Sequence, residues 1–149
     1  MQTIWLSGAE WLAVLRIGLG LWWLESWRHK DKKEWFKGGG IKWAAGVADK
    51  HRWPFVRRTF DGLVKPHPRL MAYVVAYAEL ALGLGLIVGF LTPVALIAGF
   101  VLNLIYFVLM IHDWAELGQN LMMALISAVA LFTVSWQSWS LDSVIGLFV

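Results

Sequence analysis

The chain has 149 residues, of which 59% are hydrophobic and only 15% are charged. Soluble domains carry about 25% charged residues, so this composition is typical of a single integral membrane domain covering residues 1–149. The absence of cysteine excludes disulfides, thiolate metal sites, iron–sulfur ligation and thiol nucleophiles.

Four long apolar runs dominate the sequence. A bilayer core of about 30 Å needs roughly 20 residues of α-helix. Runs of this kind cover about 5–27, 70–90, 93–111 and 117–136. A buried soluble bundle is the alternative, but the length and purity of the runs argue against it. We therefore predict an all-α fold, a four-helix transmembrane bundle whose 11 tryptophans favour the membrane–water boundary.

The first apolar run, about 5–27, is interrupted by charged residues. It carries Glu10, Arg16 and Glu25, and it lacks the basic start of a cleavable signal peptide. We interpret it as a first membrane helix that stays in place. Glu10 and Glu25 lie near its two ends, where a carboxylate can reach the headgroup region.

The segment 28–69 holds most of the charge. It contains 12 of the 13 basic residues and four acidic ones, a formal charge of +8, whereas the rest of the chain sums to −5. Because this loop is shorter than about 60 residues, the positive-inside rule applies to it. The rule predicts an inner or plasma membrane protein with loop 28–69 cytoplasmic. Both termini and the Thr92-Pro93 turn are then outside.

Within this loop, Gly38-Gly39-Gly40 is expected to break the chain, and the stretch from Pro54 to Pro66 has one apolar helical face. The second pattern predicts an amphipathic helix lying in the membrane interface. Such a helix either clamps anionic lipid headgroups or forms part of a substrate site. The candidate lipid- or anion-binding residues are Arg52, Arg57, Arg58 and Lys65.

Two ionisable residues lie near the centres of apolar runs. Such groups are costly in a bilayer and tend to be paired or functional. Arg16 is near the middle of the first run and Glu79 near the middle of the second, so antiparallel helices would place them at one depth. We predict an ion pair between them, which either fixes the helix register or holds a headgroup or passes a proton.

The third and fourth runs contribute the buried amides Asn103 and Asn120. Stripes of small and amide residues often mark helix–helix contact. The alternative is a pocket with aromatic walls and a few polar groups, as a quinone ring with two carbonyl acceptors would need. All four histidines lie outside the apolar runs, so we expect no haem, metal or iron–sulfur cluster on this chain. The predicted quinone-binding residues are Arg16, Glu79, Asn103, Asn120, Trp23 and Tyr77, with Trp22 and Tyr73 beside them and with Arg16 and Glu79 as catalytic candidates.

A short acidic turn, His112-Asp113-Trp114-Ala115-Glu116, joins the third and fourth runs. The predicted topology puts it on the same side of the membrane as the basic loop. We expect its carboxylates to pair with lysine or arginine there, which would tie the two loops together.

Several stretches resemble the DoxX/DoxD family of small four-helix membrane proteins. LRIGLG at 15–20 is similar to the first helix of that family. ELALGLGL at 79–86, followed by GFLTP at 89–93, resembles its second helix and short turn. WSLD at 139–142 resembles the polar motif after its fourth helix. The family's arginine and glutamate then correspond to Arg16 and Glu79.

This resemblance implies a function. DoxD-like members form the membrane subunit of thiosulfate:quinone oxidoreductase, and other DoxX members tether soluble redox or sulfurtransferase partners. The leading hypothesis is a quinone-interacting membrane subunit of a thiosulfate (or related sulfur compound):quinone oxidoreductase, partnered by other membrane or soluble redox subunits and not by nucleic acid. The first alternative is a non-catalytic accessory or scaffold subunit of a larger energy-converting complex. A small transporter or channel is the second.

Overall fold

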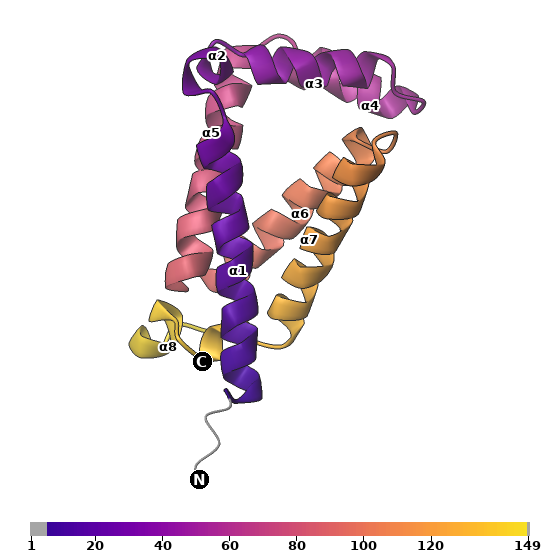
Figure 1. The fold of residues 1–149 in the computed structure, drawn as a ribbon. Helices are drawn as coiled ribbons and strands as arrows, with labels where there is room; N and C mark the ends of the chain where they lie inside the picture. The colour runs from indigo at the N-terminus through magenta and orange to yellow at the C-terminus, as the bar shows by residue number, and fades with distance from the viewer. Residues whose placement is uncertain (1–5, 149) are drawn as a thin grey trace.

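The computed structural model describes residues 6–148, and that part of the chain is helical with no strand. Its long helices are α1 (Gly8–His29), α5 (Pro68–Val88), α6 (Thr92–Leu109) and α7 (Trp114–Phe132), shown in Figure 1. They match the predicted apolar runs to within a few residues at each end. Trp5, where the first predicted run begins, lies outside the described residues.

The ends of these helices follow from local sequence signals. Ser7 and Glu10 form a capping box on α1, in which the Ser7 N–H donates to the Glu10 carboxylate at 2.7 Å. The last turn of α5 ends at Gly89, whose φ of 71° suits glycine, and Pro93 stands in the first turn of α6. Asp113 caps α7 by accepting hydrogen bonds from two first-turn amides.

Three helices, α5, α6 and α7, are long and apolar enough to cross a membrane. With 22 residues α1 is also long enough, but it carries Glu10, Arg16, Glu25 and Arg28. Within residues 6–148, hydropathy therefore identifies three candidate spans, and the status of α1 depends on where its charges lie.

The long helices form two pairs, α1 with α5 and α6 with α7, which diverge toward one end of the molecule (Figure 1). The first pair meets at two glycines. A Cβ added at Gly20 would lie 2.9 Å from the carbonyl oxygen of Gly83, closer than real Cβ atoms approach. Small residues allow such close crossings in membrane helices. Trp23 of α1 is buried between the pairs and packs against Gly99 of α6.

The basic segment folds into short helices that lie across the diverging end (Figure 1). They are α2 (Lys32–Phe36), α3 (Gly39–Asp49), α4 (Pro54–Thr59) and a π-helical segment (Phe60–Val64), and we call residues 31–64 the platform. The helix predicted between Pro54 and Pro66 corresponds to α4 and the π-helical segment. On it Val56 is buried, whereas Phe55 and Leu63 are exposed.

Helix α3 is not expected from the sequence, because the three glycines at its start should break the chain. Only Gly38 does so, with a φ of 90°, while Gly39 and Gly40 form the first turn of the helix. Gly40 packs directly on the Trp35 ring, where a Cβ would not fit. A buried stripe of small and apolar residues then holds α3 in place, and it consists of Ile41, Ala45 and Ala48.

His51 attaches the platform to α6. It is buried, its Nδ1 accepts the Trp53 N–H at 3.1 Å, and its Nε2 lies 2.9 Å from the Val108 carbonyl oxygen. Because Nδ1 accepts, Nε2 carries the proton and donates to that carbonyl. Next to this contact Val56 packs in one apolar cluster with Leu109.

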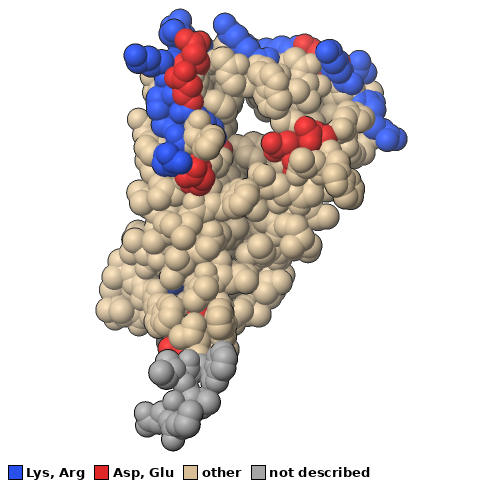
Figure 2. All heavy atoms as spheres, in the orientation of Figure 1, with Lys and Arg blue, Asp and Glu red and all other residues tan. Residues whose placement is uncertain are grey.

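The expected ion pairs between the acidic turn and the basic loop do not form among the described residues. Asp113 is used as the cap of α7, and Glu116 faces a pocket described below. The two loops meet through aromatic rings instead, since the His112 ring centre lies 5.8 Å from that of His51. Figure 2 shows the result: lysine and arginine gather on the platform, and acidic side chains rim the hollow beneath it.

At the opposite end, the residues after α7 fold back as a short 3-10 turn (Ser135–Gln137) and α8 (Leu141–Ile145). The buried Asp142 carboxylate accepts the Leu91 N–H at 2.9 Å and the Thr92 N–H at 2.8 Å. It therefore caps the start of α6. The polar motif at 139–142 is thus tied to the α5–α6 turn.

Candidate functional site

The predicted ion pair between Arg16 and Glu79 is wrong. Arg16 is fully buried and donates to three backbone carbonyls of the C-terminal segment, those of Ser135 at 3.1 Å, Ser138 at 3.3 Å and Trp139 at 2.6 Å. Glu79 pairs with another residue at the platform end. Arg16 therefore holds the C-terminal segment against α1 and does not reach the Glu79 carboxylate.

The reason is a stagger between α1 and α5. Gly20 meets Gly83, and Arg16 lies against Gly89 at the far end of α5. Glu79 is ten residues before Gly89, which is about 15 Å along a helix axis. The prediction assumes that the midpoints of the two helices lie at the same depth. They do not, because α1 extends past the end of α5 (Figure 1).

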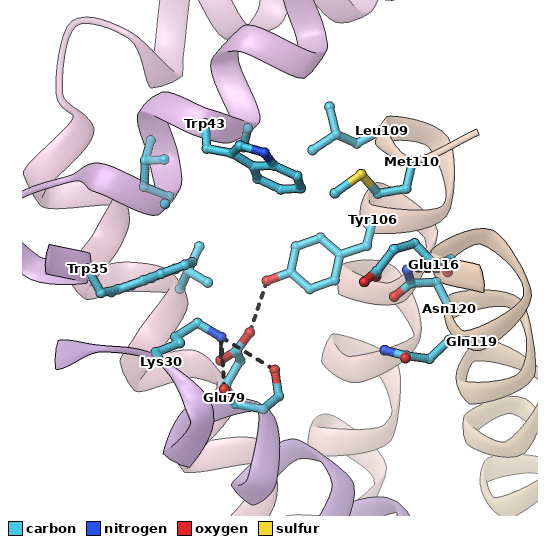
Figure 3. Close-up of a pocket in the computed structure, with 15 residues that line it drawn as sticks. Lys30, Trp35, Trp43, Glu79, Tyr106, Leu109, Met110, Glu116, Gln119 and Asn120 are labelled. Atoms are coloured by element: carbon cyan, nitrogen blue, oxygen red, sulfur yellow. Dashed lines mark hydrogen bonds and ion pairs between the residues drawn. The ribbon is translucent and has the colours of Figure 1, made fainter. Parts of the chain in front are cut away.

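Glu79 instead forms a buried cluster with Lys30 and Tyr106, shown in Figure 3. The Lys30 ammonium lies 2.5 Å from one carboxylate oxygen, and the Tyr106 hydroxyl donates to the other at 3.2 Å. The Glu79 side chain is 1% exposed and that of Lys30 11%. Lys30 also donates to the Ser26 carbonyl at 3.1 Å and lies 4.6 Å from the centre of the Trp35 ring. Such a buried charge pair is tolerable because hydrogen bonds surround both partners.

This cluster forms one wall of a pocket of about 280 Å³ between the platform and the two helix pairs. Trp35 and Trp43 come from the platform, and Gln119 and Asn120 come from α7 on the opposite side (Figure 3). The other lining residues are Ser26, Gly40, Ile41, Ala44, Val75, Leu109, Met110 and Glu116. Aromatic walls and a few convergent polar groups are typical of a small-molecule site.

The charges around the pocket limit what it can hold. Lys30 contributes one positive charge, while Glu79 and Glu116 contribute two negative ones. A small dianion would meet net repulsion there, because a partly enclosed site screens charge poorly. A neutral ring with hydrogen-bond acceptors fits better, since the Lys30 ammonium and the Gln119 amide have donor hydrogens for it, whereas the Tyr106 O–H is used by Glu79.

Comparison with known families gives one match, the DoxX family model, over residues 11–113. The chain belongs to the DoxX family. Together with α5, α6 and α7, this identifies an integral membrane protein. Comparison with curated proteins and with solved structures gives no match. The matched region of this DoxX chain contains Lys30, Glu79 and Tyr106 but ends before the pocket wall that α7 supplies.

The structure separates the predicted quinone-binding residues into four groups. Glu79 and Asn120 line the pocket. Asn103 and Trp23 are buried in the core, where the Asn103 amide donates to the Gly99 carbonyl of its own helix at 2.9 Å. Tyr77 points away from the pocket and is 57% exposed, and Trp22 and Tyr73 are likewise exposed on the outer surface. Arg16 lies at the other end of the molecule.

The predicted anion-binding residues of the DoxX chain lie on or beside the platform. Arg52, Arg57 and Arg58 are exposed. Lys65 differs, because its ammonium lies 2.5 Å from both the Asp49 and the Asp61 carboxylates. Hydrogen bonds to Asp49 and then Asp61 raise the pKa of Lys65 above its ordinary value. Its charge is thus already neutralised within the protein.

Sequence reasoning missed several residues of this pocket. Lys30 and Tyr106 carry its chemistry, and Trp35 and Trp43 form its aromatic wall. One signal was available: pairing Gly20 with Gly83 as the crossing point would have placed Glu79 level with Leu24, away from Arg16 and toward the end of α1 that Lys30 follows. No comparable signal exists for Trp35 and Trp43, because their place depends on how α3 folds over the pocket.

Proposed function

We propose that this DoxX protein is the quinone-interacting membrane subunit of an oxidoreductase, and that the quinone ring binds in the Lys30–Glu79–Tyr106 pocket. The observation that carries the proposal is the buried cluster of these three residues under an aromatic wall. In this proposal α1 is the fourth span of a transmembrane bundle and α4 lies in the membrane interface. The platform faces the cytoplasm, and both termini face outside.

The placement of charge on α1 supports its membrane role. Arg16 is buried and fully surrounded by protein, and Glu10 and Glu25 lie near the two helix ends. A charge that is hydrogen-bonded inside a bundle, or that reaches the interface, does not prevent insertion. The remaining outward face of α1 is apolar and includes Val14, Leu15, Leu21 and Trp22.

A quinone ring suits the pocket in size and in chemistry. The cavity of about 280 Å³ lies at the small end of ligand sites, enough for a headgroup but not for an isoprenoid tail. The two ring carbonyls need donors. The Lys30 ammonium, which Glu79 holds in place, can donate to one carbonyl, and the Gln119 side-chain amide on the opposite wall can donate to the other.

The reaction follows from the proton requirement of quinone reduction. Two thiosulfate ions each give up one electron and join through a new S–S bond as tetrathionate. The quinone takes up these two electrons and two protons and becomes the quinol. In this proposal both protons come from water that enters the pocket. The Glu79 carboxylate takes up each proton and passes it to a ring oxygen, while the Lys30 ammonium holds the ring by a hydrogen bond.

Thiosulfate itself would bind outside the pocket, because the net negative charge around Lys30 repels a dianion. Electrons then reach the quinone from a second subunit or from a donor held elsewhere on this chain. The exposed cations of the platform, among them Arg57 and Arg58, would attract such an anionic donor or dock the partner that carries it.

The proposal is tested with the protein purified in mild detergent together with whatever accompanies it. Binding of a soluble quinone and thiosulfate-dependent quinol formation are measured for the wild type and for Glu79→Gln, Lys30→Gln and Tyr106→Phe. We expect quinol formation to fall by at least about 100-fold in Glu79→Gln, because a positioned proton-transfer group is lost. The matched control is Glu34→Gln, which removes an exposed carboxylate from α2.

The control should keep wild-type activity. Wild-type turnover in a folded Glu79→Gln variant, or the absence of quinone binding to the wild type, would refute the pocket assignment. The second candidate function is a non-catalytic scaffold subunit, and the exposed Trp43 on the cationic platform favours it, since this surface suits a partner protein. Persistent stoichiometric subunits without quinone binding would establish that alternative.

A further inference from the structure

A second charged site lies on the outer face of the α1–α5 pair, away from the quinone pocket. Lys32 and Lys33 of α2 and Arg69 of α5 surround one open depression. No acidic side chain of residues 6–148 lies within ion-pair distance of these cations, although the neighbouring Lys37 is held by Glu34 at 2.7 Å. Three positive charges thus line one recess with no carboxylate of the described residues in ion-pair contact.

A row of aromatic rings continues from this recess down α5. Arg69, Tyr73 and Tyr77 are spaced by four residues, so they share one helix face, and all three are exposed. Phe36 of α2 stacks on Tyr73 with ring centres 4.5 Å apart and lies 6.3 Å from Tyr77. The two tyrosine rings are nearly parallel, 6.2 Å apart. The outer face of α5 therefore presents cations at its start and flat apolar surfaces over the next two turns.

A cluster of cations followed by exposed aromatic rings matches the structure of one kind of molecule. We infer that Lys32, Lys33 and Arg69, together with the Phe36–Tyr73–Tyr77 rings, bind the phosphate headgroup and upper acyl chain of an anionic phospholipid. The cations lie where α5 begins, at the level where an apolar span leaves the bilayer, and tyrosine favours the same boundary. Anionic lipids attract basic residues next to a span, most strongly on the cytoplasmic leaflet.

The environment of Lys32, one of the two lysines at the recess, agrees with this assignment. Lys32 donates to the Trp27 carbonyl and lies 4.1 Å from the centre of the Trp27 ring. Burial, and then the charge of Lys30, lower the pKa of Lys32 below its ordinary value. The charge of Glu79 opposes this shift only in part, and a bound phosphate would add a second negative charge near Lys32.

The test uses the whole protein in detergent, to which single phospholipids are added and counted by native mass spectrometry. Phosphatidylglycerol is compared with phosphatidylcholine of the same acyl chains. The variant Lys33→Gln/Arg69→Gln removes two charges from the recess. Its matched control, Lys42→Gln/Lys50→Gln, removes two exposed charges from α3 and its C-terminal end, and neither of these residues lines the recess.

We expect the wild type to prefer phosphatidylglycerol and the recess variant to bind it about tenfold more weakly, because two direct phosphate contacts are lost. The α3 control should keep wild-type affinity, and Tyr73→Ala/Tyr77→Ala should weaken the binding of both lipids by removing the ring surface. Equal losses in the recess and control variants, or equal binding of the two wild-type lipids, would overturn the site. Complete displacement of the lipid by inorganic phosphate would overturn the lipid assignment in favour of a free anion.

Quinone binding serves as an independent readout, because neither Lys33 nor Arg69 lines the Lys30–Glu79–Tyr106 pocket. The recess variant should therefore bind quinone as the wild type does. Loss of lipid preference with quinone binding retained separates this inference from the proposed function.

Discussion

At the scale of single residues, two buried charges have different kinds of partner. The two terminal nitrogens of the Arg16 guanidinium donate to neutral backbone carbonyls, whereas the Glu79 carboxylate accepts from the Lys30 ammonium and the Tyr106 hydroxyl. A buried charge that loses its partners costs several kcal/mol. Arg16 therefore stabilises the folded C-terminal segment, and Glu79 holds the polar side chains of the pocket in place.

Because Arg16 holds the C-terminal segment in place, its substitution should loosen that segment. Arg16→Gln should destabilise the protein by about 3 kcal/mol, because hydrogen bonds from a charged donor to three carbonyls are lost. Limited proteolysis should then cut after α7, and an unfolding titration should give the change in stability. The control Arg57→Gln removes an exposed arginine and should change neither result. An Arg16→Gln protein as protease-resistant as the wild type would contradict this role.

The Lys30–Glu79 pair predicts a characteristic double-mutant result. Lys30→Gln alone leaves a buried carboxylate with only the Tyr106 hydroxyl and should cost about 3 kcal/mol of unfolding free energy. Adding Glu79→Gln removes the unpaired charge and should restore most of that stability. Arg16→Gln combined with Glu79→Gln should show no such recovery, since those side chains do not meet. Recovery in the second pair but not in the first would mean that the predicted Arg16–Glu79 contact exists after all.

At the scale of helices, the crossing of α1 and α5 decides which side chains meet. Gly20 and Gly83 fix the register, and that register sets Glu79 level with Leu24, so that the Lys30 side chain reaches Glu79 from the end of α1 and Arg16 does not. Sequence periodicity gives each helix its length, but it does not give the offset between two helices. In this pair of helices, the local feature that indicates the offset is the pair of glycines on the facing surfaces.

This register predicts that Gly83 tolerates substitution by a larger residue less well than its neighbours do. A Cβ at Gly83 would lie 2.9 Å from the backbone nitrogen of Leu24, so Gly83→Ala should destabilise the pair by about 1–3 kcal/mol through overpacking. Gly18→Ala is the matched control, because no atom lies within 4 Å of its added Cβ. It should be neutral or slightly stabilising, as alanine is the better helix former. Unfolding titrations of both variants check the difference, and equal stability of the two would rule out the close crossing.

At the scale of the whole molecule, charge is segregated to one end. The platform carries the exposed cations, and the start of α1 and the C-terminal segment lie at the other end (Figures 1 and 2). A bilayer around α5, α6 and α7 would therefore separate the two ends. The proposed sidedness places the platform in the cytoplasm.

Because the chain has no cysteine, single introduced cysteines report sidedness without background labelling. Gly46→Cys lies on the exposed side of α3, and Gln137→Cys lies in the exposed 3-10 turn at the other end. In intact cells a membrane-impermeant maleimide should label Gln137→Cys and leave Gly46→Cys unlabelled until the membrane is permeabilised. The reverse pattern would place the platform outside and invert the proposed topology.

The sequence by itself determined the long helices, their capping signals, the basic character of the segment 28–69 and the burial of Arg16, Glu79, Asn103 and Asn120. These follow from hydropathy, helix length and charge, which are local properties. Only the tertiary structure decided that Arg16 binds the C-terminal segment, that Glu79 binds Lys30 and Tyr106, and that Tyr77 faces outward. Those outcomes depend on the stagger of α1 against α5 and on α3 folding over the pocket. Both are set by packing between residues far apart in the chain, which no local pattern records.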